Sequence, residues 1–243
     1  MVKKLITGLA FSLMATLLFS QGNANAFHLY PNYTQYLKNR AVPTKKAFFF
    51  KAQTNEKIVC FSFDDGPNFP KTEKLIAFLK QRKCPAVFFL IGEQMKSARI
   101  DVYKDPLFEI GCHGFHHDLY SQSTNQESLR ADVQAVLNVH EKFGFDAKFF
   151  RPPFGVINKH LAKIMNDLNI KGVLWSLDSQ DFLMRPNRDI LNDINTYLSS
   201  GDIILFHETL DLALLSDILD LVHKKGFKVV KLSELMKYPN VIP

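Results

Sequence analysis

From Lys57 to the C-terminus, short runs rich in β-branched and aromatic residues alternate with segments of helical periodicity. Strands that are separated by helices pair in parallel, because each helix carries the chain back across the sheet. The sequence therefore predicts an α/β fold, an open parallel sheet or a barrel, in which Asn125 and Asn158 cap two helices. The strand candidates are residues 57–63, 86–91, 108–112, 147–151, 171–177, 202–207 and 228–231.

The composition is that of a globular protein with one domain of ordinary size. Of the 243 residues, 47% are hydrophobic and 22% are charged, which excludes disordered and low-complexity proteins. Only the first stretch is continuously apolar, which excludes a multi-span membrane protein. Cys60, Cys84 and Cys112 are an odd number of cysteines, and their connectivity cannot be read from sequence, so we assign no disulfide.

Residues 1–26 have the layout of a secretory signal peptide. Lys3 and Lys4 precede an apolar stretch from Leu5 to Phe19, and Ala24-Asn25-Ala26 offers the small residues that a signal peptidase needs. The apolar stretch is shorter than the ~20 residues of a membrane span, which favours cleavage over a membrane anchor. We therefore expect export to the periplasm, the cell envelope or the medium, with no stable membrane anchor after cleavage.

The rest of the chain divides into an N-terminal segment and the main domain. Residues 27–56 mix aromatic and basic side chains and are expected to lie over the domain formed by residues 57–243. The formal net charge of +6 falls to +4 without the leader, which holds Lys3, Lys4 and no acid. No basic run typical of a nucleic-acid site is present, so nucleic acid is not an expected partner.

Five of the strand candidates are followed by clusters of polar residues. In parallel α/β folds the carboxyl ends of the strands meet at one rim, and active sites are built there. We therefore expect these clusters to form one site. They are Asp64-Asp65-Gly66-Pro67, His113-Gly114-Phe115-His116-His117, Arg151-Pro152-Pro153-Phe154-Gly155, Asp178-Ser179-Gln180-Asp181-Phe182 and His207-Glu208.

The clusters hold the residue types of a hydrolytic metal site. Asp65, His113 and His117 would supply one oxygen and two nitrogens, a set that suits zinc with an open coordination position. Asp64 would be placed to take a proton from a metal-activated water, and His207 to protonate a leaving group. Metal, base and acid together describe the hydrolysis of an amide or an ester.

Each cluster alone also has a structural interpretation. Asp-Gly-Pro is a common turn, and the paired aspartates could cap the next helix. A lone His-x-x-x-His pair is often solvated, Arg-Pro-Pro is often a stiff loop, and His207 could be a satisfied histidine at a strand end. The order of the clusters and their shared rim favour the functional interpretation.

Five motifs occur in an order that resembles one known family. They are Phe63-Asp64-Asp65-Gly66-Pro67, His113-x-x-x-His117, Arg151-Pro152-Pro153-Phe154-Gly155, Asp178-x-x-Asp181-Phe182 and Leu205-Phe206-His207. The chain resembles the polysaccharide deacetylases, the family 4 carbohydrate esterases of the NodB-homology type, over residues 57–235. The resemblance implies a single domain with a distorted (β/α)7 barrel, in agreement with the strand candidates. It also implies metal-dependent removal of N-acetyl groups from an amino-sugar polymer.

Carried over residue by residue, the resemblance implies catalytic roles that match the chemistry above. Asp64 would be the base, with Arg151 holding it in place. His207 would be the acid, and Asp181 beside it would favour the protonated imidazole. The metal would be held by Asp65, His113 and His117.

The resemblance also implies residues that contact the substrate. The backbone N–H of Phe154 would join the metal in stabilising the oxyanion. Leu205 would line the pocket for the acetyl methyl group. Phe154 and Phe182 would form an aromatic wall against a sugar face.

Several positions depart from the family's usual residues. Gly114 stands where the family usually has Ser or Thr, so one hydroxyl that steadies the metal loop is missing. Cys112 replaces a usual Asn and is interpreted as a bystander. Phe182 replaces a usual Trp and Phe154 a usual Tyr, which keeps the aromatic wall but removes its polar handles.

The leading hypothesis is an exported, zinc-dependent N-deacetylase of peptidoglycan, a chitin-like polymer or poly-N-acetylglucosamine. Another divalent transition metal is an alternative to zinc. An O-acetyl esterase, a small-amide hydrolase and a non-catalytic carbohydrate-binding relative are the alternative functions. The sequence does not indicate the oligomeric state.

Overall fold

The computed structural model describes residues 31–96, 98–121, 124–183 and 185–243. The expected signal peptide, residues 1–26, lies outside the described residues, as does the start of the 27–56 segment. Within the described ranges, no helix is both long enough and apolar enough to cross a membrane.

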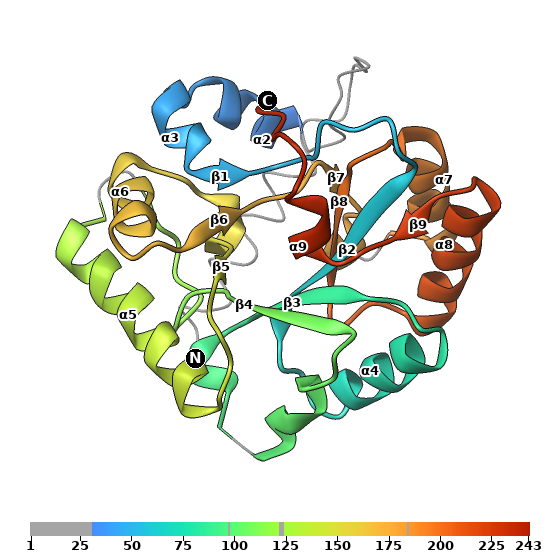
Figure 1. Cartoon of the computed structure of the whole chain (residues 1–243), viewed down its shortest axis with the longest axis horizontal. Coiled ribbons are helices and arrows are strands. Elements are labelled where there is room, and N and C mark those ends of the chain that lie inside the picture. The colour runs from blue at the N-terminus through green and yellow to red at the C-terminus, as the bar shows by residue number, and fades with distance from the viewer. Residues whose placement is uncertain (1–30, 97, 122–123, 184) are drawn as a thin grey trace.

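A curled parallel sheet forms the centre of the molecule (Figure 1). Its strand order is β1-β6-β5-β4-β3-β2-β8-β7, with β9 paired to β2, and all of these pairs are parallel. The strands are β1 (Phe48–Phe49), β2 (Ile58–Gly66), β3 (Ala86–Leu90), β4 (Phe108–Cys112), β5 (Phe149–Phe150), β6 (Lys171–Val173), β7 (Leu177–Asp178), β8 (Ile203–His207) and β9 (Lys228–Val229).

The sheet curls because β6 and β7 are close in sequence but lie near opposite ends of the strand order. Only three residues separate them, so the sheet must bend round to bring its two ends together. The predicted α/β class with a distorted parallel barrel is therefore confirmed.

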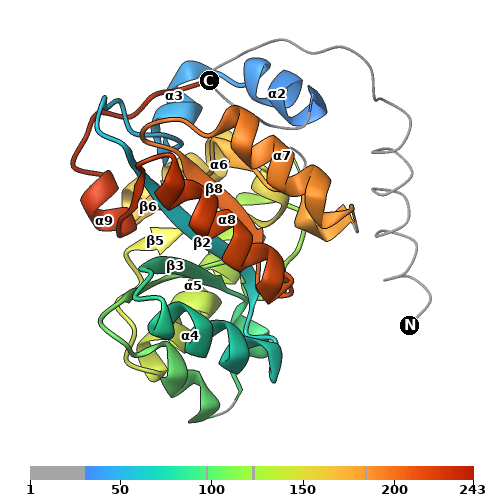
Figure 2. The ribbon, with the colours of Figure 1, turned by 90° about the vertical axis from the view of Figure 1, so that its right-hand side faces the viewer.

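Helices cover the outside of the curled sheet. α4, α7 and α8 lie on one flank (Figure 2), and α5 and α6 lie on the opposite flank (Figure 1). Asn125 and Asn158 cap α5 and α6 as predicted, because their side chains accept hydrogen bonds from the backbone N–H groups of Glu127 and Leu161. The α-helices are α2 (Pro31–Lys38), α3 (Val42–Lys46), α4 (Lys71–Gln81), α5 (Gln126–Lys142), α6 (Lys159–Asp167), α7 (Asn187–Tyr197), α8 (Leu212–Lys224) and α9 (Leu232–Leu235).

Several strand ends differ from the prediction by one to three residues, and two differences are larger. The predicted strand 171–177 is wrong in its middle, because the chain changes hydrogen-bond partners there. The Leu174 N–H donates to the Phe49 carbonyl, whereas the Ser176 N–H donates to the Ile203 carbonyl. β1 was not predicted, and it brings part of the 27–56 segment into the sheet beside β6.

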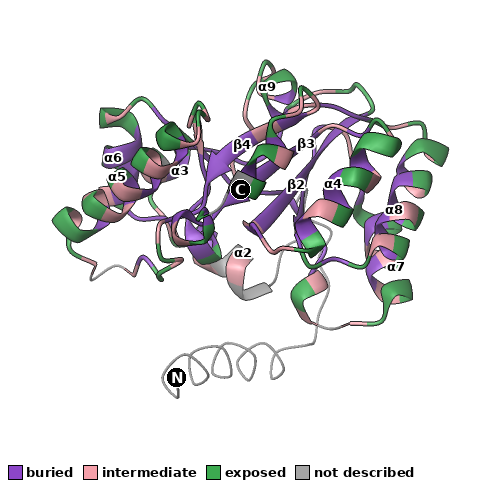
Figure 3. Ribbon diagram, turned by 90° about the horizontal axis from the view of Figure 1, so that it is seen from below, coloured by how far each residue is buried: buried purple, intermediate pink, exposed green. Residues whose placement is uncertain are grey.

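The alternation of side chains along β2 separates the core from the site. Phe61 and Phe63 pack outward with the apolar residues of α4 and α8, while Cys60, Ser62 and Asp64 alternate with them and point into the curl. Figure 3 shows the strands buried and the outer helix faces exposed. Because Asp64 lies near the end of β2, its carboxylate emerges at the carboxyl rim of the curled sheet.

Candidate active site

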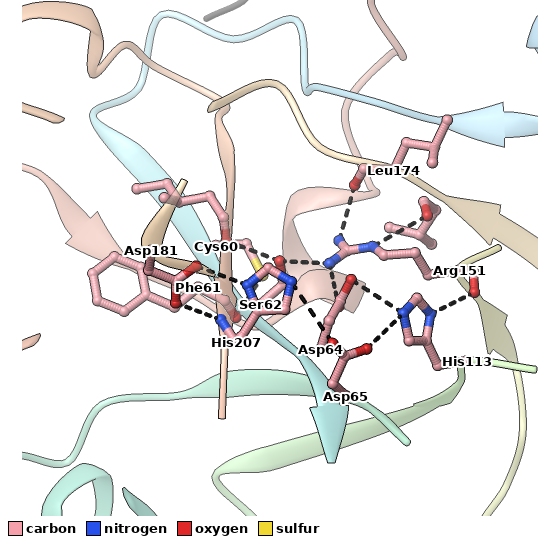
Figure 4. A network of polar contacts seen from close by, with 12 residues as sticks. Cys60, Phe61, Ser62, Asp64, Asp65, His113, Arg151, Leu174, Asp181 and His207 are labelled. Atoms are coloured by element: carbon pink, nitrogen blue, oxygen red, sulfur yellow. Dashed lines mark hydrogen bonds and ion pairs between the residues drawn. The ribbon is translucent and has the colours of Figure 1, made fainter. Parts of the chain in front are cut away.

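The residues that the sequence singled out converge at the carboxyl ends of the strands (Figure 4). Asp64 and Asp65 lie near the end of β2, and His207 closes β8. His113 and Arg151 follow directly after β4 and β5. In Figure 4 the two aspartates lie between His207 on one side and His113 on the other.

Asp65, His113 and His117 form a cluster that could hold a metal ion. Their ligand atoms all lie within 4.8 Å of one another. Asp65 Oδ1 is 3.3 Å from His113 Nε2 and 3.2 Å from His117 Nε2. Asp65 and His117 both adopt left-handed backbone conformations, with φ of 66° and 59°. Such conformations are costly for residues other than glycine and are concentrated at functional sites.

The chemistry of this cluster fits a divalent cation. Asp65 Oδ1 is buried and accepts no hydrogen bond from any described residue. Burial alone would raise the pKa of Asp65, but the imidazoles of His113 and His117 outweigh it and hold the pKa far below its usual value. A buried, ionised oxygen that faces two imidazole nitrogens and lacks a proton donor is suited to coordinate a metal.

His113 is oriented by a backbone contact behind the cluster. Its Nδ1 lies 2.8 Å from the Arg151 carbonyl oxygen, and only a protonated Nδ1 can donate to that acceptor. The Nε2 atom of neutral His113 is then free of a proton and faces Asp65. Fixing the tautomer through the second ring nitrogen is the usual way in which proteins prepare a histidine ligand.

Asp64 is held by a buried arginine inside the curl. Arg151 is 0% exposed and Asp64 is 3% exposed, and their Nη1–Oδ1 distance is 2.7 Å. The same guanidinium donates to Ser62 Oγ at 3.0 Å and to the Leu174 carbonyl at 3.0 Å, and it lies over the Phe89 ring. Since the arginine is restrained on several sides, it fixes the orientation of the Asp64 carboxylate.

His207 is paired with Asp181 at the rim. Its Nδ1 lies 2.7 Å from Asp181 Oδ1, and its backbone N–H donates to Asp181 Oδ2 at 2.8 Å. Burial alone would lower the pKa of His207, but Asp181 outweighs it and raises the pKa to about 9. The Nε2 atom points toward the metal cluster, 4.0 Å from Asp65 Oδ2.

Two exposed aromatic rings flank the cluster. Phe154 is 42% exposed and Phe182 is 47% exposed. The Phe154 ring lies 4.6 Å from the His117 ring, and the Phe182 ring lies 5.1 Å from the His207 ring. Leu205 is buried on β8, and it shares a face with His207 because side chains alternate along a strand.

Two tyrosines that no sequence motif indicates support the loop of Phe154. Tyr33 of α2 donates to the Gly155 carbonyl at 3.1 Å. The Tyr36 hydroxyl accepts from the Ile157 N–H at 2.8 Å and donates to the Ile157 carbonyl at 2.6 Å. These partners are more than 120 residues apart in sequence, so no local pattern could have indicated them.

Glu208 belongs to one of the predicted polar clusters, but it is buried and bonded to residues outside these clusters. It accepts hydrogen bonds from the hydroxyls of Tyr103 and Thr72. Burial raises the pKa of Glu208 to about 7, although these hydrogen bonds oppose the shift. Gly66 leaves room for Glu208, because an added Cβ there would lie 1.8 Å from its Oε1 atom.

Comparison with known proteins identifies the family. The chain matches the family model "Polysaccharide deacetylase" over residues 51–173. A peptidoglycan-N-acetylglucosamine deacetylase of Bacillus cereus is 33% identical over 199 residues, which cover 78% of this chain and 92% of that protein. The chain belongs to the polysaccharide deacetylase family. The resemblance found in the motifs, and the deacetylase class that it implied, are confirmed at the level of the family.

Two solved structures of this family share the fold. A peptidoglycan N-acetylglucosamine deacetylase in complex with 4-naphthalen-1-yl-N-oxidanyl-benzamide has a TM-score of 0.71 at 27% identity, covering 80% of this chain and 94% of that one. A family 4 pseudoenzyme from Bacillus anthracis also has a TM-score of 0.71, at 19% identity, over 80% of this chain and 70% of that one. At 19% identity the likeness shows the fold alone. Because one of these proteins is a pseudoenzyme, the shared fold by itself does not imply activity.

This polysaccharide deacetylase spans different shares of its curated relatives. It covers nearly the whole Bacillus cereus relative, but only 39% of a 28% identical peptidoglycan-N-acetylmuramic acid deacetylase of Bacillus subtilis. The relatives therefore share this domain, and some of them are considerably longer proteins.

Proposed function

We propose that this protein is an exported, zinc-dependent deacetylase that removes N-acetyl groups from peptidoglycan. The observation that carries the proposal is the convergence of three parts at one rim. They are the metal-ligating cluster of Asp65, His113 and His117, the Asp64–Arg151 pair and the His207–Asp181 pair. The names of the Bacillus relatives support peptidoglycan as the first substrate to test.

Asp64 acts as the general base in this proposal. Arg151 occupies Asp64 Oδ1, and the other carboxylate oxygen, Oδ2, lies 3.6 Å from His113 Nε2, beside the metal cluster. That oxygen can accept a proton from a water at the cluster. A metal ion held there would acidify this water and polarise the acetyl carbonyl. Because Arg151 is buried and its guanidinium bonds Asp64 Oδ1, it keeps the Asp64 carboxylate correctly oriented between turnovers.

His207 acts as the general acid. An amide nitrogen leaves poorly unless it is protonated, so N-deacetylation needs a proton donor on the side of the sugar amine. Asp181 accepts from Nδ1 and keeps His207 in its imidazolium form, which leaves the Nε2 proton facing the site. The pKa of about 9 means that the acid is charged at neutral pH.

The remaining residues position the substrate. The backbone N–H of Phe154 is proposed to bind the acetyl oxygen as it becomes negative, and the left-handed φ of 58° at Phe154 sets the direction of this backbone segment. Leu205 is proposed to contact the acetyl methyl group. The exposed rings of Phe154 and Phe182 offer apolar faces on which a sugar ring can stack.

The proposal is tested by acetate release from the mature protein, residues 27–243. We would supply peptidoglycan, N-acetylglucosamine oligomers and O-acetylated sugars, each with added zinc and with a chelator. Zinc-dependent release from peptidoglycan is the expected result. Release from the O-acetyl substrates alone would instead identify an esterase, and carbohydrate binding that is independent of zinc and without turnover would identify a non-catalytic relative.

A further inference from the structure

The loop between the two histidine ligands is held through its backbone on one side by η1 (Gly92–Gln94). The Gly92 N–H donates to the Gly114 carbonyl at 3.0 Å, and the Glu93 N–H donates to the Phe115 carbonyl at 2.9 Å. These contacts supply donors for two carbonyl groups of the loop, but the N–H groups of the loop still need acceptors.

The N–H groups of this loop are bound on the other side by one carboxylate. Asp132 of α5 accepts from the Phe115 N–H at 3.0 Å through Oδ2 and from the His116 N–H at 3.4 Å through Oδ1. The Tyr120 hydroxyl donates to Asp132 Oδ2 at 2.5 Å. The two oxygens of Asp132 thus join the backbone between the histidine ligands to a helix of the scaffold.

The Tyr120 hydroxyl occupies the space that a side chain at position 114 would need, which accounts for the glycine there. An added Cβ at Gly114 would be 2.7 Å from Tyr120 Oη and 3.4 Å from Asp132 Oδ2. The φ of +73° at Gly114 also favours glycine. The space that a Ser or Thr side chain would fill at this position is therefore occupied by the hydroxyl of Tyr120, which lies on the same stretch of chain after β4.

We propose that Asp132 and Tyr120 are positioning residues of the metal site, which set the spacing between His113 and His117 before a metal binds. The inference rests on the metal site of the proposed function. Neither side chain is among the ligands, so both act through the loop backbone. Partners of this kind contribute about 10- to 100-fold to metal affinity when they hold a ligand in place.

The Tyr120 hydroxyl can be removed without removing the packing of its ring. Tyr120 is 2% exposed and belongs to the main apolar cluster, where its ring stacks 6.4 Å from that of Phe150. A phenylalanine at position 120 would keep this packing and lose only the contact with Asp132. This property separates a positioning role from a contribution to the core.

The first test is the zinc affinity of the mature protein, measured by competition with a chromophoric chelator. Asp132→Asn should raise the zinc Kd about 10- to 100-fold, because its amide N–H₂ would oppose one of the two backbone donors. Tyr120→Phe should raise it by a smaller factor, about 10-fold. The matched control is Tyr238→Phe, which removes a tyrosine hydroxyl bonded to Glu56 at 2.6 Å and should leave the Kd unchanged.

Thermal unfolding of the metal-free variants shows whether each one is folded. A zinc Kd within twofold of the wild-type value in both folded variants would overturn the proposal. Failure of the wild-type protein to bind zinc would overturn both this inference and the proposed function. Tight zinc binding without acetate release would overturn the proposed function alone, because the roles of Asp132 and Tyr120 are tested by the zinc Kd and not by turnover.

A second test compares Gly114→Ala in two backgrounds. In the wild-type protein the new methyl group would displace the Tyr120 hydroxyl from Asp132, in addition to straining the backbone. In the Tyr120→Phe background the hydroxyl is absent, and only the strain and the 3.1 Å approach of the added Cβ to Pro153 Cγ remain. We expect Gly114→Ala to raise the zinc Kd by a larger factor in the wild type; equal factors would show that the Tyr120 hydroxyl does not occupy this space.

Discussion

The two sides of the candidate site each contain an aspartate bonded to a cationic partner, but the surroundings differ. Asp64 and Arg151 are almost fully buried inside the curl. Asp181 and His207 lie at the rim, where the His207 side chain is 15% exposed. The partner of Asp64 is charged at every pH of interest, whereas the partner of Asp181 gains and loses a proton.

This difference suits the two proposed tasks. A base that must be ionised at the start of every cycle benefits from a permanent, immobile counter-charge. An acid that gives up a proton and regains it needs a titratable group within reach of water. The following predictions would break or sharpen this contrast, from the largest expected effect to the smallest.

Asp64→Asn should lower kcat for acetate release by about 10²- to 10⁴-fold, the range typical of a lost general base. The amide keeps the shape of the carboxylate but cannot accept the proton. Zinc should remain bound, and its stoichiometry can be measured by metal analysis of the purified variant. Loss of zinc would mean that Asp64, rather than Asp65, is the ligand.

His207→Ala should lower kcat by about 10²-fold on an N-acetyl substrate and by less on an activated ester, whose leaving group needs no proton. Parallel rate measurements on the two substrates give the comparison. An equal loss on both would argue against His207 as the acid of the leaving group.

Asp181→Asn should move the alkaline limb of the pH–rate profile to lower pH. Asp181 raises the pKa of His207 to about 9, so without this carboxylate the imidazolium is lost earlier as the pH rises. The variant should also be less stable than the wild type at pH 6 and below. That difference should shrink as the pH rises through about 9, because the folded pKa lies above the unfolded one.

An unchanged alkaline limb in Asp181→Asn would show that another group sets it. The same profile recorded for Asp220→Asn, which removes a carboxylate of α8 that is 64% exposed, is the control for a general effect of charge.

Tyr36→Phe should have the smallest effect of this series. Loss of the hydroxyl removes the contacts with the Ile157 backbone and loosens the loop that carries Phe154. A hydrogen bond of this kind contributes about 0.5–1.5 kcal/mol, which predicts a fall in kcat of roughly 2- to 10-fold. Zinc affinity should not change, and a weaker affinity would place the effect on the metal cluster instead.

Residues with a local signal were predictable from the sequence. The alternation of strand and helix patterns indicated a parallel α/β fold, because periodicity reports which face of an element is buried. The caps Asn125 and Asn158 were also predictable, because a capping side chain binds a backbone N–H only two or three residues away. The resemblance to the family motifs indicated Asp65, His113 and His117 as candidate metal ligands. Such motifs are short and continuous in sequence, so they can be found without the fold.

Tertiary structure alone decided how these elements are held in place. β1 joins β6, the 171–177 segment changes partners halfway, and Tyr33 and Tyr36 reach the loop of Phe154. Each of these is a contact between distant segments, and a tyrosine or a two-residue strand has no pattern that specifies its partner.

The glycine at position 114 shows the division most clearly. In the sequence, Gly114 stands beside His113 where the family usually has the hydroxyl of a Ser or Thr. In the folded chain the hydroxyl of Tyr120 takes that place and binds Asp132, which holds the loop. The sequence by itself determined which groups are available for chemistry, because residue type and local periodicity are written along the chain. The fold decided which groups orient them, because that depends on how distant segments pack.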